Sequence, residues 1–252
     1  MLSKNKIKFI RSLEKKKFRD ESACFLAEGN KLVADIYPFF ECECLVAKPA
    51  WLAMQGDIRA KELIVAEENE IEKASLLKTP QDVLAVFHQP RRVLDSEALK
   101  NELSIVLDGI QDPGNLGTIV RLADWFGIRR LICSQDTADV YNPKTVQASM
   151  GAIARVQVFY LSLPDWLNEV EGIPVYGTFL EGKNIYTEAL SPSGLIVMGN
   201  EGKGISRSVE KRITQKLHIP NYPPDTESTE SLNVAMATAI VCSEFRRRQL
   251  GD

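Results

Sequence analysis

This 252-residue sequence has few histidines and no paired cysteine motif. Only His88 and His218 are present, and the five cysteines form no Cys-x-x-Cys pair and have no matching histidine spacing. A disulfide framework or a zinc site needs such spacings. Cys42 and Cys44 would face the same side of a strand, but the rest of the sequence offers them too few partners. We therefore predict reduced thiols and no metal site.

Long apolar stretches are also lacking. Residues 1–18 have charges spread throughout and no apolar core, unlike a secretory signal. The longest apolar stretch, at 234–242, is too short to cross a bilayer. We therefore expect a soluble, cytoplasmic protein that has no membrane partner.

Net positive charge is absent too, since the formal net charge is −3. Proteins that bind nucleic acids neutralise phosphates with clustered Lys and Arg, so the total argues weakly against such a partner. The distribution is uneven, however. Eight basic residues and one acidic residue, Glu14, lie between Lys4 and Arg19, and three arginines at 246–248 end the last predicted helix. Because such runs are more often solvated faces than binding sites, they permit a nucleic-acid partner without identifying one.

The first part of the chain predicts a small α/β domain. A helix is expected over 7–17 and another from Asn30, and short strands and helices of this kind alternate in an α/β sandwich. The polar stretch at 89–92 leads into a linker, so we predict domains over 1–92 and 101–252 joined by residues 93–100. The expected strands of the first domain are 25–29, 44–47, 62–66 and 83–87.

Six apolar runs follow the linker and alternate with helical windows. Short buried strands separated by helices indicate a mostly parallel sheet with helices on both faces. Ligands bind to such sheets beyond the carboxyl ends of the strands, so the loops that follow the strands are the candidate site. The runs are 104–107, 130–133, 155–159, 174–179, 194–198 and 216–220.

The first informative loop, at 107–121, leads from a strand into a helix that we expect to be capped near Asn115. Arg121 lies on the side of that helix opposite its apolar residues. Two interpretations stay open for Arg121: it faces the loop or solvent, or it forms an ion pair with Asp124 three residues later. Asn115 is likewise either a plain helix cap or a functional residue.

Two more loops carry unusual residues. Three glycines and a single carboxylate, Glu201, follow a buried strand at 196–206, and glycines allow a backbone to approach a ligand closely. This loop is not a phosphate-binding Walker loop, and 107–121 contains no Gly-x-Gly-x-x-Gly. The last loop joins 218–222 to a polar stretch at 223–230 and a long helix, with Ser231 as the expected N-cap and Asn233 in the first turn.

Together these loops carry a family resemblance. Asn-x-Gly-x-x-x-Arg at 115–121, Gly-Asn-Glu-Gly-x-Gly at 199–204 and Ser-Leu-Asn-Val at 231–234 resemble the three motifs of the SpoU (TrmH-like) family of RNA ribose methyltransferases. The resemblance covers 101–252. Segments 25–33 and 79–85 resemble the substrate-binding domain of that family, which is similar to ribosomal protein L30e.

The resemblance implies more than periodicity can show. It implies a SPOUT-class fold with a C-terminal trefoil knot, a homodimer, and transfer of a methyl group from S-adenosylmethionine to a ribose 2′-hydroxyl of RNA. Ribosomal RNA is favoured over transfer RNA, because the extra N-terminal domain resembles a binder of ribosomal RNA. No short motif encodes which nucleotide is modified, since RNA specificity comes from shape and unstacked bases.

The resemblance also implies individual site residues. Arg121 is implied as the catalytic residue, and because a guanidinium stays protonated near neutral pH, we expect it to bind the target phosphate and stabilise the developing alkoxide. Asn115, Ser231, Asn233 and Glu201 are implied as its supporting catalytic residues. The implied cofactor contacts are Thr178, Leu180, Gly199, Asn200, Glu201, Gly202, Ile219 and Leu232.

Two other functions remain open at this point. The first is a non-catalytic RNA-binding or ribosome-associated protein with the same fold. The second is a dinucleotide-dependent enzyme that uses the loop at 107–121.

Overall fold

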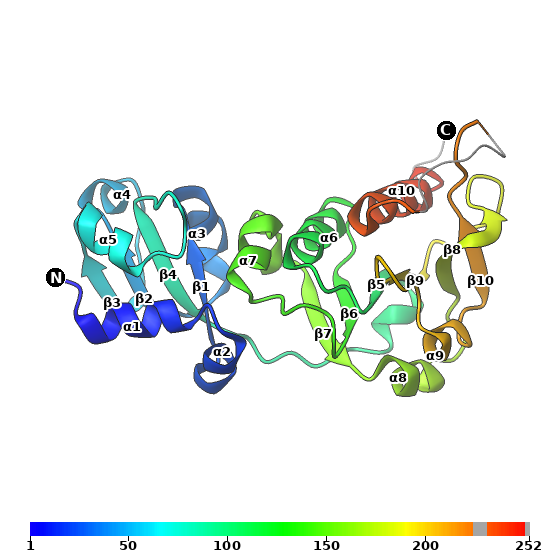
Figure 1. The fold of residues 1–252 in the computed structure, drawn as a ribbon, viewed down its shortest axis with the longest axis horizontal. Helices are drawn as coiled ribbons and strands as arrows, with labels where there is room; N and C mark the ends of the chain where they lie inside the picture. Colours follow the sequence, from blue (N-terminus) through cyan, green and yellow to red (C-terminus); the bar gives the residue numbers. More distant parts are fainter. Residues whose placement is uncertain (224–230, 250–252) are drawn as a thin grey trace. The chain divides into compact units, whose positions relative to one another are not determined.

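The chain folds into two compact units. The computed structural model describes residues 1–223 and 231–249, so the predicted polar loop lies outside the described residues from position 224 onward. Unit 1 comprises residues 1–91 and 139–154, and unit 2 comprises 92–138 and 155–252. Figure 1 shows the elements of both.

Unit 1 contains a four-stranded sheet in the order β1-β4-β2-β3. The β1–β4 and β2–β4 pairs are antiparallel, whereas β2 and β3 run parallel. Helices α1 and α5 pack on one face, where Ile10 and Ile71 join the core beneath strands β1 and β4. Its elements are α1 (Lys4–Ser12), α2 (Lys16–Ser22), β1 (Cys24–Glu28), α3 (Asn30–Ile36), η1 (Tyr37–Phe39), β2 (Cys42–Ala47), α4 (Pro49–Ala53), β3 (Ala60–Val65), α5 (Glu68–Ala74), β4 (Val83–His88), α7 (Pro143–Ser149) and η3 (Ala152–Ala154).

The single helix predicted over 7–17 is wrong, because the chain forms two helices there. Helix α1 ends at Ser12 and α2 begins at Lys16. The guanidinium of Arg19 donates to the carbonyl oxygens of Leu13 and Glu14, at 2.8 Å each. These carbonyls lie in the turn between the two helices, so a buried side chain replaces the next turn of helix as their partner.

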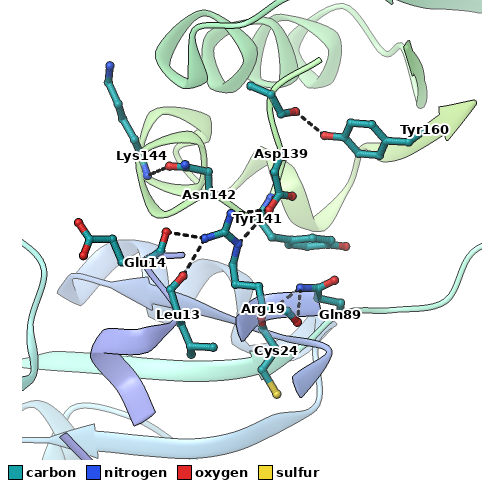
Figure 2. Close-up of polar contacts among 11 residues, drawn as sticks. Leu13, Glu14, Arg19, Cys24, Gln89, Asp139, Tyr141, Asn142, Lys144 and Tyr160 are labelled. Carbon is teal, nitrogen blue, oxygen red and sulfur yellow. Dashed lines mark hydrogen bonds and ion pairs between the residues drawn. The ribbon is translucent and has the colours of Figure 1, made fainter. Parts of the chain in front are cut away.

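Residues 139–154 pack with unit 1, although they lie inside the predicted 101–252 domain in sequence. Arg19, which is 1% exposed, donates through Nε and Nη2 to the carboxylate of Asp139 at 2.9 and 2.6 Å (Figure 2). The ring of Tyr141 lies 4.8 Å from that of Phe25. Gln147 of α7 donates to the carbonyl of Glu28 at 2.6 Å. Strand β1 is therefore covered by a segment more than a hundred residues away along the chain.

Unit 2 contains a six-stranded sheet in the order β10-β8-β9-β5-β6-β7, and every adjacent pair is parallel. Helices α6 and α10 pack together on one side of this sheet, and α8 and α9 lie on the other (Figure 1). The predicted α/β class and parallel sheet are confirmed, while the trefoil knot stays a prediction. The elements are η2 (Ala98–Lys100), β5 (Leu103–Asp108), α6 (Pro113–Trp125), β6 (Arg130–Ser134), β7 (Gln157–Leu161), α8 (Leu163–Glu169), β8 (Val175–Asn184), β9 (Gly194–Gly199), α9 (Arg207–Glu210), β10 (Gln215–His218) and α10 (Val234–Arg247).

The strand order of unit 2 places two of the predicted loops side by side. From β5 the chain adds β6 and β7 on one side, and it later adds β8, β9 and β10 on the other. Strands β5 and β9 are neighbours across this switch, and their last residues, Asp108 and Gly199, are paired. The loops that follow these two residues therefore leave the sheet at the same edge, which is where parallel sheets bind ligands.

The described residues contain free thiols, no metal-binding cluster and no membrane-spanning helix. All five cysteines are buried free thiols. Residues 1–223 and 231–249 contain no group of three His, Cys, Asp or Glu side chains placed to hold a metal ion. Within the same ranges, no helix combines the length and the apolar character needed to cross a membrane.

Candidate active site

The loop after β9 closes on itself. The backbone N–H groups of Asn200 and Gly204 donate to each other's carbonyl oxygens at 3.0 and 2.8 Å. The side chain of Asn200 accepts from the N–H groups of Gly202 and Lys203, and it donates to the Gly109 carbonyl at 2.7 Å. A Cβ atom on Gly199 would lie 2.3 Å from the Gly204 backbone, so only glycine fits there. The amide of Asn200 thus holds this loop to the loop after β5.

Three loops meet through hydrogen bonds made by Asn115. Its Nδ2 donates to Oε1 of Glu201 at 2.8 Å, and its Oδ1 accepts from Nδ2 of Asn233 at 3.1 Å. Asn115 is not the helix cap, because the side chain of Asp112 caps α6 by accepting from the Asn115 N–H at 2.8 Å. The Asn115 side chain is therefore available for the contacts that join residues 86 and 118 positions away.

The start of the last helix also differs from the expectation. Asn233 is the N-cap of α10, and its Oδ1 accepts from the N–H groups of Ala235 and Met236. Ser231, which was expected to cap the helix, lies before it and is exposed. An Asn at this position caps α10 with its oxygen while its Nδ2 bonds Asn115, and a serine hydroxyl offers fewer donors for such a double role.

Arg121 is exposed and has no hydrogen-bond or ion-pair partner among residues 1–223 and 231–249. The alternative ion pair with Asp124 is wrong, because the carboxylate of Asp124 accepts three hydrogen bonds from Arg155, at 2.7 to 3.0 Å. Arg121 lies six residues beyond Asn115 on α6, which is about 9 Å along the helix axis. Its donors are therefore unused within the described part of the chain.

A cavity of about 720 Å³ lies beside this junction, within the size range of small-molecule sites. All the residues predicted to contact a cofactor line it, and so does Ser231. The predicted residues that do not line it are Asn115, Arg121 and Asn233. The predicted lining residues are Thr178, Leu180, Gly199, Asn200, Glu201, Gly202, Ile219 and Leu232.

The cavity wall also includes side chains that sequence analysis did not select. Lys216 forms an ion pair with Glu210 at 2.5 Å, and its Nζ lies 4.6 Å from the centre of the Phe179 ring. The Nδ1 atom of His218 lies 3.3 Å from the carbonyl oxygen of Phe179. Glu181 and Lys203 complete the charged part of the wall. Their only sequence signal is position, since most of them lie on or just after strands β8, β9 and β10.

Comparisons with known proteins show which family the chain belongs to. The model of the SpoU rRNA Methylase family matches residues 102–243, and that of the MRM3-like substrate binding domain matches residues 4–85. The chain is 33% identical over 247 residues to the 23S rRNA (guanosine(2553)-2′-O)-methyltransferase RlmP of Bacillus subtilis, covering 96% of each chain.

Two solved structures are similar over nearly the whole chain. A putative RNA methyltransferase of the TrmH family from Porphyromonas gingivalis has a TM-score of 0.90 at 45% identity, covering 98% of this chain and 99% of that one. An AdoMet-bound rRNA methyltransferase from Sinorhizobium meliloti has a TM-score of 0.82 at 30% identity, covering 98% and 96%.

Proposed function

Because the chain belongs to the SpoU rRNA methylase family, we propose that it transfers a methyl group from S-adenosylmethionine to a ribose 2′-hydroxyl of RNA, with ribosomal RNA as the favoured substrate. The observation that carries this proposal is the hydrogen-bonded junction of Asn115, Glu201 and Asn233 beside the cavity. The RlmP relative, which acts on 23S rRNA, supports the choice of RNA.

The cavity suits S-adenosylmethionine by size and charge. Three carboxylates and two lysines line it, and Lys216 is already paired with Glu210. The cofactor bears two positive groups and one carboxylate, so an acidic excess in the wall complements it. Thr178 and Leu180 within strand β8 and Ile219 just after β10 would flank the cofactor, and the closed loop at 199–204 would contact it through backbone groups.

When bound, the cofactor supplies an electrophilic methyl carbon on a sulfonium. The ribose 2′-oxygen forms the new bond to that carbon while the carbon–sulfur bond breaks, and the hydroxyl proton passes to phosphate or water. In this proposal Arg121 binds the target phosphate through its planar fork and stabilises the charge that develops on the oxygen. Asn115, Asn233, Ser231 and Glu201 position the loops around the reacting groups.

A second copy of the chain and a cytoplasmic location complete the proposal. Trp125 on α6 is 83% exposed, and Met236 on α10 is 54% exposed. Large apolar side chains exposed on two packed helices support an interface with a second copy. We propose that Trp125→Asp yields a monomer, which sedimentation velocity would detect.

The bacterial rRNA methyltransferase relatives support the cytoplasm as the site of the reaction.

The deciding experiment measures transfer of labelled methyl groups from S-adenosylmethionine into purified ribosomal and transfer RNA. Incorporation into 23S rRNA at an alkali-resistant linkage is the expected result. Incorporation into transfer RNA alone would show that transfer RNA, and not ribosomal RNA, is the substrate. Tight binding of RNA without incorporation would favour the non-catalytic alternative, and saturable binding of NAD without S-adenosylmethionine would favour the dinucleotide enzyme.

A further inference from the structure

Positive charge is concentrated at the start of unit 1. The segment from Lys4 to Arg19 has eight basic residues and one acidic residue, which gives it a net charge of +7 in a chain of net charge −3. The rest of the chain therefore carries −10. Since the RNA backbone is a dense row of negative charges, most of this protein repels it at long range. Electrostatic attraction to the RNA backbone is therefore expected at this basic segment.

The arginines near the C-terminus, the other basic run of the sequence, are used within unit 2. Arg246 donates to the carbonyl of Phe126 at 2.7 Å. Arg247 and Arg248 both form ion pairs with Glu244, at 2.9 and 2.7 Å. These contacts hold the end of α10 in place and compensate part of its charge. The arginine run at 246–248 is thus a poor candidate for phosphate binding.

Several basic side chains of the N-terminal run are also used internally. Arg19 is buried against Asp139, Lys6 forms an ion pair with Glu62 at 2.5 Å, and Lys17 pairs with Glu21 at 3.8 Å. In contrast, Lys4 and Lys8 are exposed, and within the described ranges neither has a hydrogen-bond or ion-pair partner. Arg11 is exposed; it donates to the carbonyl oxygens of Lys73 and Ser75 and interacts electrostatically with the Glu28 carboxylate.

Lys4, Lys8 and Arg11 share one face of α1. Lys4, Lys8 and Arg11 follow the spacing i, i+4 and i+7, which places side chains on the same side of a helix. Ile10, on another side of the helix, is buried in the core of unit 1, and Ile7, a neighbour of Lys4 and Arg11 on the helix surface, is partly buried against that core. Lys4 and Lys8 are separated by about 6 Å along the helix axis. Lys4, Lys8 and Arg11 are called the α1 basic face below.

We propose that the α1 basic face binds phosphate groups of the RNA substrate, so that unit 1 grips the RNA through its backbone. Lysine ammonium groups act as point charges toward phosphates and read no base, so this face contributes affinity and positioning rather than sequence choice. The match of residues 4–85 to a substrate binding domain includes the whole helix. The identity of the bound polymer as substrate rests on the function proposed above.

A double variant that removes two positive charges, together with a matched control variant, tests the α1 basic face. The test variant is Lys4→Gln with Lys8→Gln, and the control is Lys31→Gln with Lys78→Gln. The control removes two lysines of unit 1 that are also exposed and, within the described part of the chain, also without a partner. The measurement is the dissociation constant for transcribed 23S rRNA between 50 and 200 mM salt, a range over which phosphate contacts show clearly.

The test variant is expected to bind about tenfold more weakly at low salt, and its slope of log affinity against log salt should fall by roughly 1.5, as expected for two lost phosphate contacts. Lys4→Arg with Lys8→Arg should retain the wild-type slope, because the charge is preserved. The control should bind like the wild type. An unchanged slope in the test variant, or an equal loss of RNA affinity in the control, would overturn the proposal that the α1 basic face binds RNA.

Methyl transfer by the same preparations separates this inference from the proposed function. The test variant is expected to raise the KM for RNA and to leave the affinity for S-adenosylmethionine unchanged. A wild-type protein that binds 23S rRNA but transfers no methyl group would refute the proposed function, and the salt slopes would still decide the basic face. A test variant with wild-type RNA affinity would refute the proposal that the α1 basic face binds RNA. The methyl-transfer assay would still test the proposed function.

Discussion

Arg19 in unit 1 and Arg121 in unit 2 show how one residue type serves a fold in one region and a site in another. Arg19 is 1% exposed, and its guanidinium donates to two carbonyl oxygens and the Asp139 carboxylate. Arg121 is exposed and, within the described residues, donates to nothing. A guanidinium whose donors are all used stabilises structure, whereas one with vacant donors is available for a ligand.

The largest expected effect is on the stability of unit 1. Arg19→Met leaves the Asp139 carboxylate, which is 12% exposed, without its partner, and breaking a buried pair in this way costs about 3–5 kcal/mol. Hydrogen exchange of the β1 amides should accelerate accordingly. Combining Arg19→Met with Asp139→Leu should recover most of the loss. If the double variant exchanges as fast as the single one, the pair is not what holds residues 139–154 to β1.

The next effect is on the methyl-transfer rate. Arg121→Ala should slow single-turnover transfer by about 10²–10³-fold, the usual cost of removing a preorganised donor that stabilises developing charge. Thermal unfolding should not change, since the side chain is exposed and has no partner within the described residues. Arg121→Lys separates charge from geometry: a lysine that keeps most of the rate would remove the case for a planar fork.

A smaller effect is expected at the three-loop junction. Asn115→Ala removes the hydrogen bonds to Glu201 and Asn233 but leaves the Asp112 cap of α6 in place. Loosened positioning should slow transfer by about tenfold to a hundredfold, while S-adenosylmethionine binding measured by calorimetry stays within a few-fold of wild type. An equal loss of cofactor affinity would show that the junction shapes the cavity rather than the reacting groups.

The smallest effect is a pH dependence in unit 1. Burial raises the pKa of Glu28 above its ordinary value, although hydrogen bonds from Ser75 and Leu76 oppose the shift. Between the ordinary and the raised pKa the folded state holds more protons than the unfolded state, so the stability of unit 1 falls as pH rises through this window. Glu28→Gln should remove this component from the unfolding free energy measured from pH 4 to 7. A variant with the wild-type pH profile would contradict it.

Local pattern was enough to predict the elements of unit 2, since all six apolar runs became strands and the sheet is parallel as expected. It failed where a nearby polar side chain bonded to backbone groups that the expected helix or cap would have used. The helix expected over 7–17 is interrupted because Arg19 takes the carbonyl groups of Leu13 and Glu14. The caps were displaced for a related reason: Asp112 and Asn233 perform the capping that spacing assigned to Asn115 and Ser231.

The order of residues alone determined the parallel sheet and the three motifs, because hydrophobic period and loop chemistry are local properties of a chain. Only the tertiary structure decided which polar groups are available. It used Arg19 and Arg246 internally, left Arg121 and Lys4 exposed, and brought Asn115 to Glu201 and Asn233. The physical reason is that a donor's availability depends on acceptors brought near it by folding, and these lie tens of residues away in sequence.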